Sequence, residues 1–172
     1  PALGQYVNYK VALQHEHIDA AVVASPSNLH IEAAQYLAEK GIPILMEKPL
    51  ATSLEGLDKL VSIVSEKRIV TMMGQSFRWH EGMLEVKKIL DSRSLGKPLS
   101  VNYSGGQYLP DWHPGEDYRK EYAAQKKMGG GAMFVSMSHS LDTIEWLFGN
   151  IVEYSGEKKR VGDLEIDVDD TT

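Results

Sequence analysis

The sequence predicts an α/β fold, in which a parallel sheet is followed by a second, α+β part with an open sheet. Two observations lead to this prediction. From residue 18 to residue 90, short apolar runs alternate with stretches of helical periodicity, and the connections between them are short. After SLGKP (94–98) this alternation stops and longer strand-like stretches begin.

Three apolar runs are predicted to be the parallel strands. They are IDAAVVA at 18–24, IPILM at 42–46 and IVTMM at 69–73. Short runs of this kind, without polar alternation, are typical of strands that are covered on both faces. Residues 1–11 contain no recognisable helix start, strand or glycine fingerprint.

A helix is predicted after each of these strands. The first covers 29–40, with Ser27 as its N-cap and Gly41 just past its end. The second follows TSLE (52–55), which fits a capping box, and the third covers 81–90. The buried stripe expected on the second helix comprises Leu54, Leu57, Val61 and Val64.

The second part is predicted to hold a more solvated sheet and one long helix. The stretches 99–109, 151–161 and 164–170 are strand-like, and the helix is expected over 135–148. The chain lacks an initial methionine and stops where a strand-like alternation has just begun, so we expect it to be a piece of a longer protein.

Composition excludes several classes of function. The 172 residues carry a formal net charge of −6, whereas a nucleic-acid-binding protein would present a basic face. No signal peptide opens the chain, and no apolar run approaches the roughly 18 residues of a membrane span. The absence of cysteine removes disulfides, thiol catalysis and thiolate metal sites, and it fits a cytoplasmic location.

Polar stretches follow each predicted strand directly: SPSNLH, EKP and GQSFRW. In open α/β sheets the ligand crevice lies beyond the carboxyl ends of the strands, so we expect these stretches to line a crevice. There Glu47 and Lys48 could be half-buried, because each would have a ligand or the other as its partner. The alternative is that both simply flank a turn in solvent.

Four longer stretches carry a resemblance to a known family. AAVVASPSNLH with GIPILMEKPLATS, MMGQSFRWHEGM, and GGGAMFVSMSHSLDTIEWLFG resemble the Gfo/Idh/MocA (glucose–fructose oxidoreductase/inositol dehydrogenase) family of NAD(P)-dependent oxidoreductases. The resemblance covers nearly the whole chain. It implies that 1–94 is the C-terminal part of a Rossmann-like dinucleotide-binding domain without its glycine fingerprint. Residues 95–172 would begin the α+β substrate and oligomerisation domain.

The resemblance also implies an activity. The full-length protein would transfer a hydride between NAD or NADP and a hydroxyl or keto carbon of a sugar or sugar nucleotide, and would be a homo-oligomer, a dimer or tetramer. The fragment alone is expected to be inactive. The alternative is a non-catalytic carbohydrate- or nucleotide-binding protein on the same scaffold.

Individual roles follow from the same resemblance. Lys48 and His139 would be catalytic, with His139 exchanging a proton with the substrate hydroxyl, and a cis peptide would precede Pro49. The residues implied on the cofactor side are Ser25, Pro26, Asn28, His30, Glu47, Lys48, Pro49, Gln75 and Arg78.

The predicted helix over 135–148 offers independent support for His139. Its apolar stripe leaves His139 and Asp142 three residues apart on another face, where a carboxylate can raise the basicity of an imidazole. A capping or surface pair is the alternative. Many relatives carry an aspartate where this chain has Val135, and Gly129 to Gly131 mark a turn or a close backbone approach.

A loop rich in aromatic and charged residues, GGQYLPDWHPGEDYRKEY (105–122), follows the first strand-like stretch of the second part. Aromatic rings can stack on sugar faces, and an arginine can bind a carboxylate or phosphate through two parallel hydrogen bonds. Such residues suit a glycosyl or sugar-nucleotide ligand. The loop resembles that of family members from surface-polysaccharide and nonulosonic-acid pathways. The alternative is a core-packing loop. The residues expected to bind substrate are Tyr108, Trp112, His113, Tyr118, Arg119 and Asp142.

No metal site is expected. His15 and His17 form an HxH pair, but on a helix their side chains point about 200° apart, and no third ligand is evident.

Overall fold

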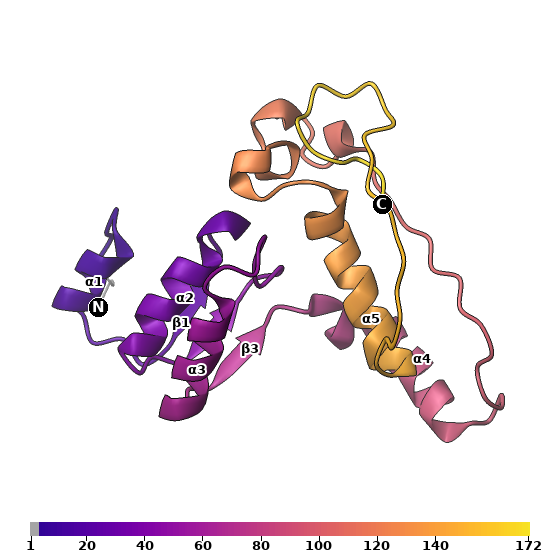
Figure 1. Cartoon of the computed structure of the whole chain (residues 1–172), viewed down its shortest axis with the longest axis horizontal. Coiled ribbons are helices and arrows are strands. Elements are labelled where there is room, and N and C mark those ends of the chain that lie inside the picture. The colour runs from indigo at the N-terminus through magenta and orange to yellow at the C-terminus, as the bar shows by residue number, and fades with distance from the viewer. Residues whose placement is uncertain (1–3) are drawn as a thin grey trace.

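A parallel sheet organises the N-terminal part of the computed structural model, which describes residues 4–172 (Figure 1). Its three strands are β1 (Ala21–Val23), β2 (Ile44–Met46) and β3 (Thr71–Met73), in the order β1-β2-β3. The predicted parallel α/β arrangement is confirmed. Each strand is shorter than its apolar run; in the second run Pro43, which has no N–H to donate, lies just before the ladder begins.

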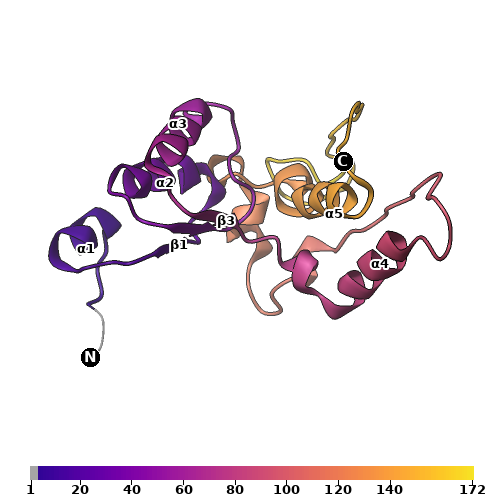
Figure 2. The same cartoon turned by 90° about the horizontal axis from the view of Figure 1, so that it is seen from below.

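The helices α2 (His30–Glu39) and α3 (Leu57–Lys67) lie on the same side of this sheet (Figure 2). Because side chains alternate between the faces of a strand, one set from β1 and β2 packs beneath the helices and the other set points away. The buried core comprises Val23, Ala33, Ala34, Leu37, Ala38, Ile42, Ile44, Met46 and Leu60. On the opposite face Val22, Leu45 and Met72 are exposed.

A helix at the N-terminal end was not predicted. The structure has α1 (Tyr9–His15), with Asn8 as its N-cap, where the side-chain oxygen accepts from the backbone N–H of Lys10. Asn8 is a favoured N-cap residue, so the sequence did carry a start signal. The helix buries none of its residues, which explains why it shows no apolar stripe.

The starts of α2 and α3 also differ from the prediction. A 3₁₀ turn, η1 (Ser27–Leu29), precedes α2, and the buried Ser27 makes no capping hydrogen bond. The helix does end at Gly41 as predicted, with φ of 80°.

The predicted capping box at 52–55 does not form, because α3 begins only after Gly56, at φ 76°. The later start changes which side chains face the core. Leu54 is 83% exposed and Val61 is exposed, whereas Leu60 and Ile63 pack inward.

Beyond the sheet, the chain contains two long helices joined by short turns and extended chain. They are α4 (Glu81–Ser92) and α5 (Ser138–Phe148), and a π-helical turn, η7 (Met133–Met137), leads into α5. The 3₁₀ turns are η2 (Ser76–Trp79), η3 (Leu109–Asp111), η4 (Tyr118–Lys120), η5 (Tyr122–Ala124) and η6 (Lys126–Met128). None of the helices within residues 4–172 has the length and apolar composition that a membrane crossing needs.

The strands predicted over 99–109, 151–161 and 164–170 are wrong for this chain. Within the described residues these stretches contribute only one isolated antiparallel bridge, between Lys159 and Thr171. In the first two stretches large apolar side chains are solvated, with Leu99 93% and Val152 98% exposed, whereas Ile166 in the third is buried. A strand-like pattern forms a strand only when a second chain segment offers it a ladder of hydrogen bonds, and residues 4–172 offer these stretches no more than the bridge at Lys159.

The glycine run 129–131 brings the C-terminal part against the first strand exit. A Cβ added to Gly129, at φ 81°, would lie 2.6 Å from Cγ2 of Thr52 and 2.9 Å from Cβ of Ser27. A Cβ on Gly130 would run into the backbone oxygens of Tyr122 and Ala123. The interpretation of these glycines as a close backbone approach is therefore confirmed.

Gly129→Ala is accordingly expected to destabilise the full-length protein more than Gly115→Ala does. Gly115 has a similar φ of 92° but nothing within 4 Å of an added Cβ, so it isolates the backbone penalty, roughly 1–2 kcal/mol. The crowding at Gly129 should add about 1–3 kcal/mol, measured by urea unfolding. Equal losses in the two variants would contradict this close approach.

Candidate functional site

The polar stretches that follow the three strands meet at one edge of the sheet, as predicted. Backbone hydrogen bonds continue the ladder past the strand ends, from Glu47 N to Val23 O at 2.9 Å and from Gly74 N to Met46 O at 2.7 Å. The chain segments around Ser25, Lys48 and Gln75 therefore leave the sheet side by side.

Lys48 reaches from this edge to the C-terminal part of the chain. A cis peptide joins Lys48 to Pro49, as the resemblance implied. The half-buried side chain donates from Nζ to the backbone oxygen of Val135 at 2.8 Å. Burial lowers the pKa of Lys48, and the nearby negative charge of Glu47 opposes that shift.

Val135, which stands where many relatives carry an aspartate, still provides an acceptor for Lys48. Its side chain is buried, but its carbonyl, which lies in the π-helical turn η7, serves as the acceptor for the ammonium group. The missing carboxylate therefore does not leave Lys48 without a partner on this helix.

His139 lies in α5, one turn after Val135, and is partly buried. Its ring stacks on Phe77 of η2, with 4.8 Å between the ring centroids. Burial is the main cause that lowers the pKa of His139, and the Lys48 charge adds to it, while Glu47 and Asp142 oppose the shift. The neutral imidazole is thus favoured, and its buried Nδ1 has no hydrogen-bond partner in the described part of the chain.

Asp142 does not pair with His139. Its two carboxylate oxygens accept from Nε and Nη2 of Arg78, at 2.9 and 2.7 Å. The turn η2 carries both Arg78 and Phe77, so it contacts α5 through an ion pair and a ring stack. Asp142 thereby helps to fix η2 against the helix that carries His139.

Two polar groups lie at the strand exits. The buried Oε1 of Gln75 has no hydrogen-bond partner within residues 4–172. The carboxylate of Glu47 lies over Gly74, where an added Cβ would be 3.0 Å from Oε1 of Glu47. An unpaired buried amide oxygen is a costly feature that a bound polar ligand can satisfy.

His30 takes a position that the sequence did not indicate. It is only 1% exposed, with Nδ1 2.7 Å from the oxygen of Pro49 and Nε2 2.8 Å from the oxygen of Ser25. Both ring nitrogens thus face backbone oxygens inside the protein, and neither is offered to a cofactor.

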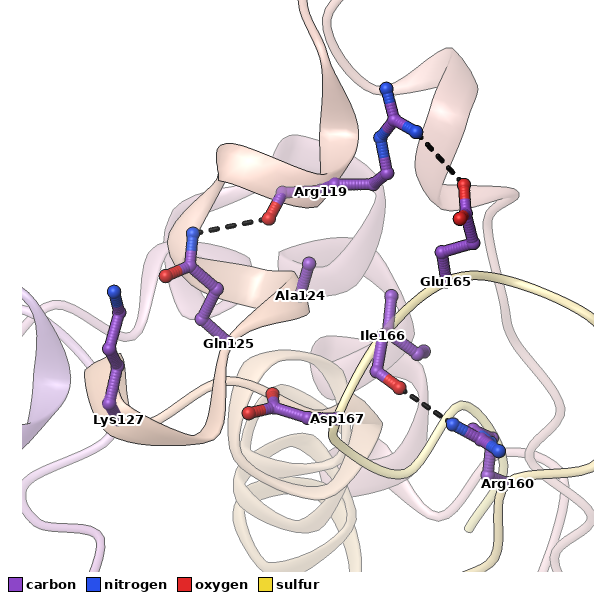
Figure 3. Close-up of a pocket in the computed structure, with 8 residues that line it drawn as sticks. All are labelled: Arg119, Ala124, Gln125, Lys127, Arg160, Glu165, Ile166 and Asp167. Carbon is purple, nitrogen blue, oxygen red and sulfur yellow. Dashed lines mark hydrogen bonds and ion pairs between the residues drawn. The ribbon is translucent and has the colours of Figure 1, made fainter.

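The arginine of the loop over 105–122, Arg119, pairs with carboxylates of this chain. Arg119 donates from Nε to Asp117 at 2.7 Å and from Nη1 to Glu165 at 2.9 Å, a contact that Figure 3 shows. Arg119 lines a hollow of about 450 Å³, and neither Lys48 nor His139 lines it. The residues that line this hollow are Arg119, Ala124, Gln125, Lys127, Arg160, Glu165, Ile166 and Asp167.

The other residues expected to bind substrate are spread along this loop. The phenolic oxygen of Tyr118 accepts from the backbone N–H of Glu165, and Tyr108 is exposed. Nε1 of Trp112 is buried and has no partner among the residues that the structure describes. Nδ1 of His113 lies 3.0 Å from a carboxylate oxygen of Glu121. A single cleft that contains all of these side chains and Lys48 is not seen in the described chain.

The structure pairs neither HxH histidine with a third metal ligand. His15 ends α1, and His17 lies beyond it, 3.3 Å from Asp19, with its side chain 90% exposed. The group of possible ligand atoms that the described residues do bring together is His113, Glu116 and Glu121, within 4.8 Å of one another. Within this group Nδ1 of His113 lies 3.0 Å from Oε2 of Glu121, which is buried.

Sequence reasoning missed two contributors to this site. The carbonyl of Val135 could not be found, because every residue has one and only the fold brings this one to Lys48. Phe77 lies between Gln75 and Arg78 in a stretch already singled out, so its place in that stretch was the available signal.

Comparison with known proteins assigns the family. Residues 2–75 match the oxidoreductase family with an NAD-binding Rossmann fold, and residues 83–172 match the GFO/IDH/MocA C-terminal domain. The chain belongs to the GFO/IDH/MocA family. The resemblance that the sequence motifs indicated is confirmed, and the N-terminal part carries the NAD-binding fold of this family.

Several GFO/IDH/MocA relatives are sugar enzymes by name. The chain is 29% identical to levoglucosan dehydrogenase of Pseudarthrobacter phenanthrenivorans over 143 residues, 83% of this chain and 36% of that protein. It is 28% identical to 2,7-anhydro-N-acetylneuraminate hydratase of Mediterraneibacter gnavus over 138 residues, 80% of this chain and 35% of that protein.

A solved levoglucosan dehydrogenase, in complex with NADH and levoglucosan, has a similar fold with a TM-score of 0.73 and 27% identity. That match covers 96% of this chain and 46% of the other. The chain thus spans less than half the length of these three relatives.

The residues present fit a nicotinamide cofactor. Oε1 of Gln75, which has no partner within residues 4–172, could accept from an amide group, and the Glu47 carboxylate over Gly74 could accept another hydrogen bond. The unpaired Nδ1 of His139 and the ammonium of Lys48 supply further polar contacts from the facing helix and the β2 exit.

Proposed function

We propose that the full-length protein is an NAD(P)-dependent oxidoreductase that transfers a hydride between the cofactor and a hydroxyl or keto carbon of a sugar or sugar nucleotide. The 172 residues alone are proposed to be inactive. The observation that carries the proposal concerns Lys48 and His139, which come from different parts of the chain. Lys48 is tied to the turn that leads into the His139 helix, and the two side chains are close enough for the lysine charge to lower the pKa of His139.

Each of the two groups suits one task in such a reaction. A histidine whose pKa lies below the usual value is neutral near pH 7, so it can accept the proton of a substrate hydroxyl. A lysine ammonium, held by one carbonyl oxygen, has further N–H donors for the negative charge that develops on the substrate oxygen. Bound NAD or NADP supplies the hydride acceptor.

The remaining site residues keep the roles that the resemblance implied. Ser25, Pro26, Asn28, Glu47, Pro49, Gln75 and Arg78 are proposed to line the cofactor side. Tyr108, Trp112, His113 and Tyr118 are proposed to contact the sugar. Arg119 is proposed to organise its own loop, because its guanidinium already binds two carboxylates.

The alternative function is carbohydrate or nucleotide binding without catalysis. The retained Lys48 and His139 favour the enzyme, as do the dehydrogenase and hydratase names of the relatives.

The experiment mixes the full-length protein with NAD⁺ or NADP⁺ and a panel of sugars, and follows the fluorescence of the reduced cofactor. The panel includes levoglucosan, inositols, 2,7-anhydro-N-acetylneuraminate and a UDP-sugar acid. Because a hydratase adds water without net change of the cofactor, sugar consumption is followed by mass spectrometry as well. Binding of NADH with neither cofactor reduction nor sugar consumption would favour the non-catalytic alternative.

We also propose that the protein is cytoplasmic and a homo-oligomer, with the boundary between its two domains at residues 94 and 95. The absence of cysteine supports the location, and the exposed apolar side chains of Leu99, Val152 and Tyr154 support association. Light scattering of the full-length protein measures the oligomeric state, and a monomer would contradict the proposal.

A further inference from the structure

His30 bridges two strand exits from inside the protein. It is the first residue of α2, and its ring is almost completely buried, with 1% exposure. Nδ1 lies 2.7 Å from the oxygen of Pro49, which follows β2, and Nε2 lies 2.8 Å from the oxygen of Ser25, which follows β1. One imidazole thus joins two loops that are 24 residues apart in the sequence.

The ring has only acceptors as partners. A backbone oxygen accepts hydrogen bonds and cannot donate, so every bond here needs a ring N–H. Either neutral tautomer carries one N–H and serves one of the two oxygens, whereas the imidazolium serves both. Neither nitrogen is left to contact a ligand, so any role of His30 in the reaction acts through Pro49 and Ser25.

The two links act on different parts of the crevice. Pro49 has no backbone N–H, so its carbonyl is the only backbone group through which a hydrogen bond can hold it. Lys48 directly precedes Pro49, and its Nζ reaches the oxygen of Val135. Ser25 begins the loop at the β1 exit, which the proposed function places on the cofactor side.

We infer that His30 is a positioning residue with two separable roles. An N–H on Nδ1 holds Pro49 and thereby sets the position of Lys48, and an N–H on Nε2 holds Ser25 and thereby shapes the cofactor side of the crevice. The imidazolium fills both roles at once, and each neutral tautomer fills one. This inference rests on the proposed oxidoreductase function, and it names a residue that touches neither substrate nor cofactor.

Two amide variants separate the roles. In His30→Asn the amide nitrogen can occupy the place of Nδ1, and in His30→Gln it can occupy the place of Nε2. His30→Gln keeps the Ser25 link, so we expect kcat to fall by ~10–10²-fold with little change in the Kd for NADH. His30→Asn keeps the Pro49 link, so we expect kcat close to wild type and a Kd for NADH raised by ~3–10-fold.

His30→Leu lacks both donors and should show both defects. His17→Asn and His17→Gln are the matched controls, because the side chain of His17 is 90% exposed. All variants are compared by thermal unfolding, so that a loss of stability is recorded separately from kcat and Kd.

A measurement without cofactor or substrate tests the links directly. In full-length wild-type protein labelled with ¹⁵N-histidine, NMR should show a ring N–H that exchanges slowly with solvent and disappears in His30→Leu. This signal and the Kd for NADH remain measurable if no sugar is turned over, so failure of the proposed function is distinguishable from failure of this inference. Three outcomes would overturn the inference: a fast-exchanging or missing ring N–H, the same kinetic pattern in the two amide variants, or loss of folding in all three His30 variants.

Discussion

Replacing Lys48 by methionine is expected to reduce the turnover of the full-length protein by ~10²-fold or more, with little change in melting temperature. Methionine keeps much of the length and apolar volume of the lysine stem but removes the ammonium group. That group is desolvated and held at 2.8 Å by the oxygen of Val135, where its charge acts strongly on a developing alkoxide. Loss of turnover without loss of stability would identify a role in the transition state.

The matched control is Lys97→Met. Lys97 also directly precedes a proline, but it is exposed, and the described chain has its cis proline peptide only at Lys48–Pro49. The control should keep wild-type kcat. Near-normal turnover in Lys48→Met would remove Lys48 from the mechanism, and an equal loss in both variants would show that the effect is not local to the site.

His139→Asn is expected to lower turnover by ~10²–10⁴-fold and to remove the part of the pH–rate profile (the limb) that reflects titration of His139. Sugar oxidation needs the neutral imidazole, so its rate should be full above the pKa of His139 and fall as the pH drops through it. Since burial and Lys48 lower that pKa, the limb should lie below the usual range of a histidine. Reduction of the keto sugar needs the protonated ring, so it should lose rate as the pH rises through the same pKa.

The measurement is a pH profile of kcat in both directions, with His17→Asn as the control at an exposed histidine. The control should reproduce the wild-type limb. A His139→Asn variant that kept this limb, with only a few-fold loss of rate, would show that another group is the base. Lys48, whose pKa is also lowered by burial, would be the first candidate.

The N-terminal sheet was predictable because its signals are local. The three apolar runs, their short connections and the polar residues after each run place Ser25, Lys48 and Gln75 at one edge of a parallel sheet. Helix starts were less predictable, since a 3₁₀ turn before α2 and a left-handed Gly56 before α3 displaced the expected caps.

The C-terminal part was harder to predict because its secondary structure depends on contacts with segments that are distant in the sequence. The helix over 135–148 has its own periodicity and was confirmed, with the π-helical turn as an addition. The stretches 99–109, 151–161 and 164–170 have the composition of strands, but a strand also needs a neighbouring ladder. Side-chain pattern alone does not report whether that neighbour is present.

The sequence by itself determined the family motifs, the parallel sheet and the edge at which the candidate site lies. The reason is that apolar periodicity, and the alternation of strands with helices, can be read from residues that are close in the sequence. Only the tertiary structure decided the partners within that site. Lys48 pairs with a backbone oxygen 87 residues away, Asp142 pairs with Arg78, and His30 turns inward to two carbonyls. Backbone acceptors are the same at every residue, so no sequence pattern distinguishes the one that the fold brings within hydrogen-bonding distance.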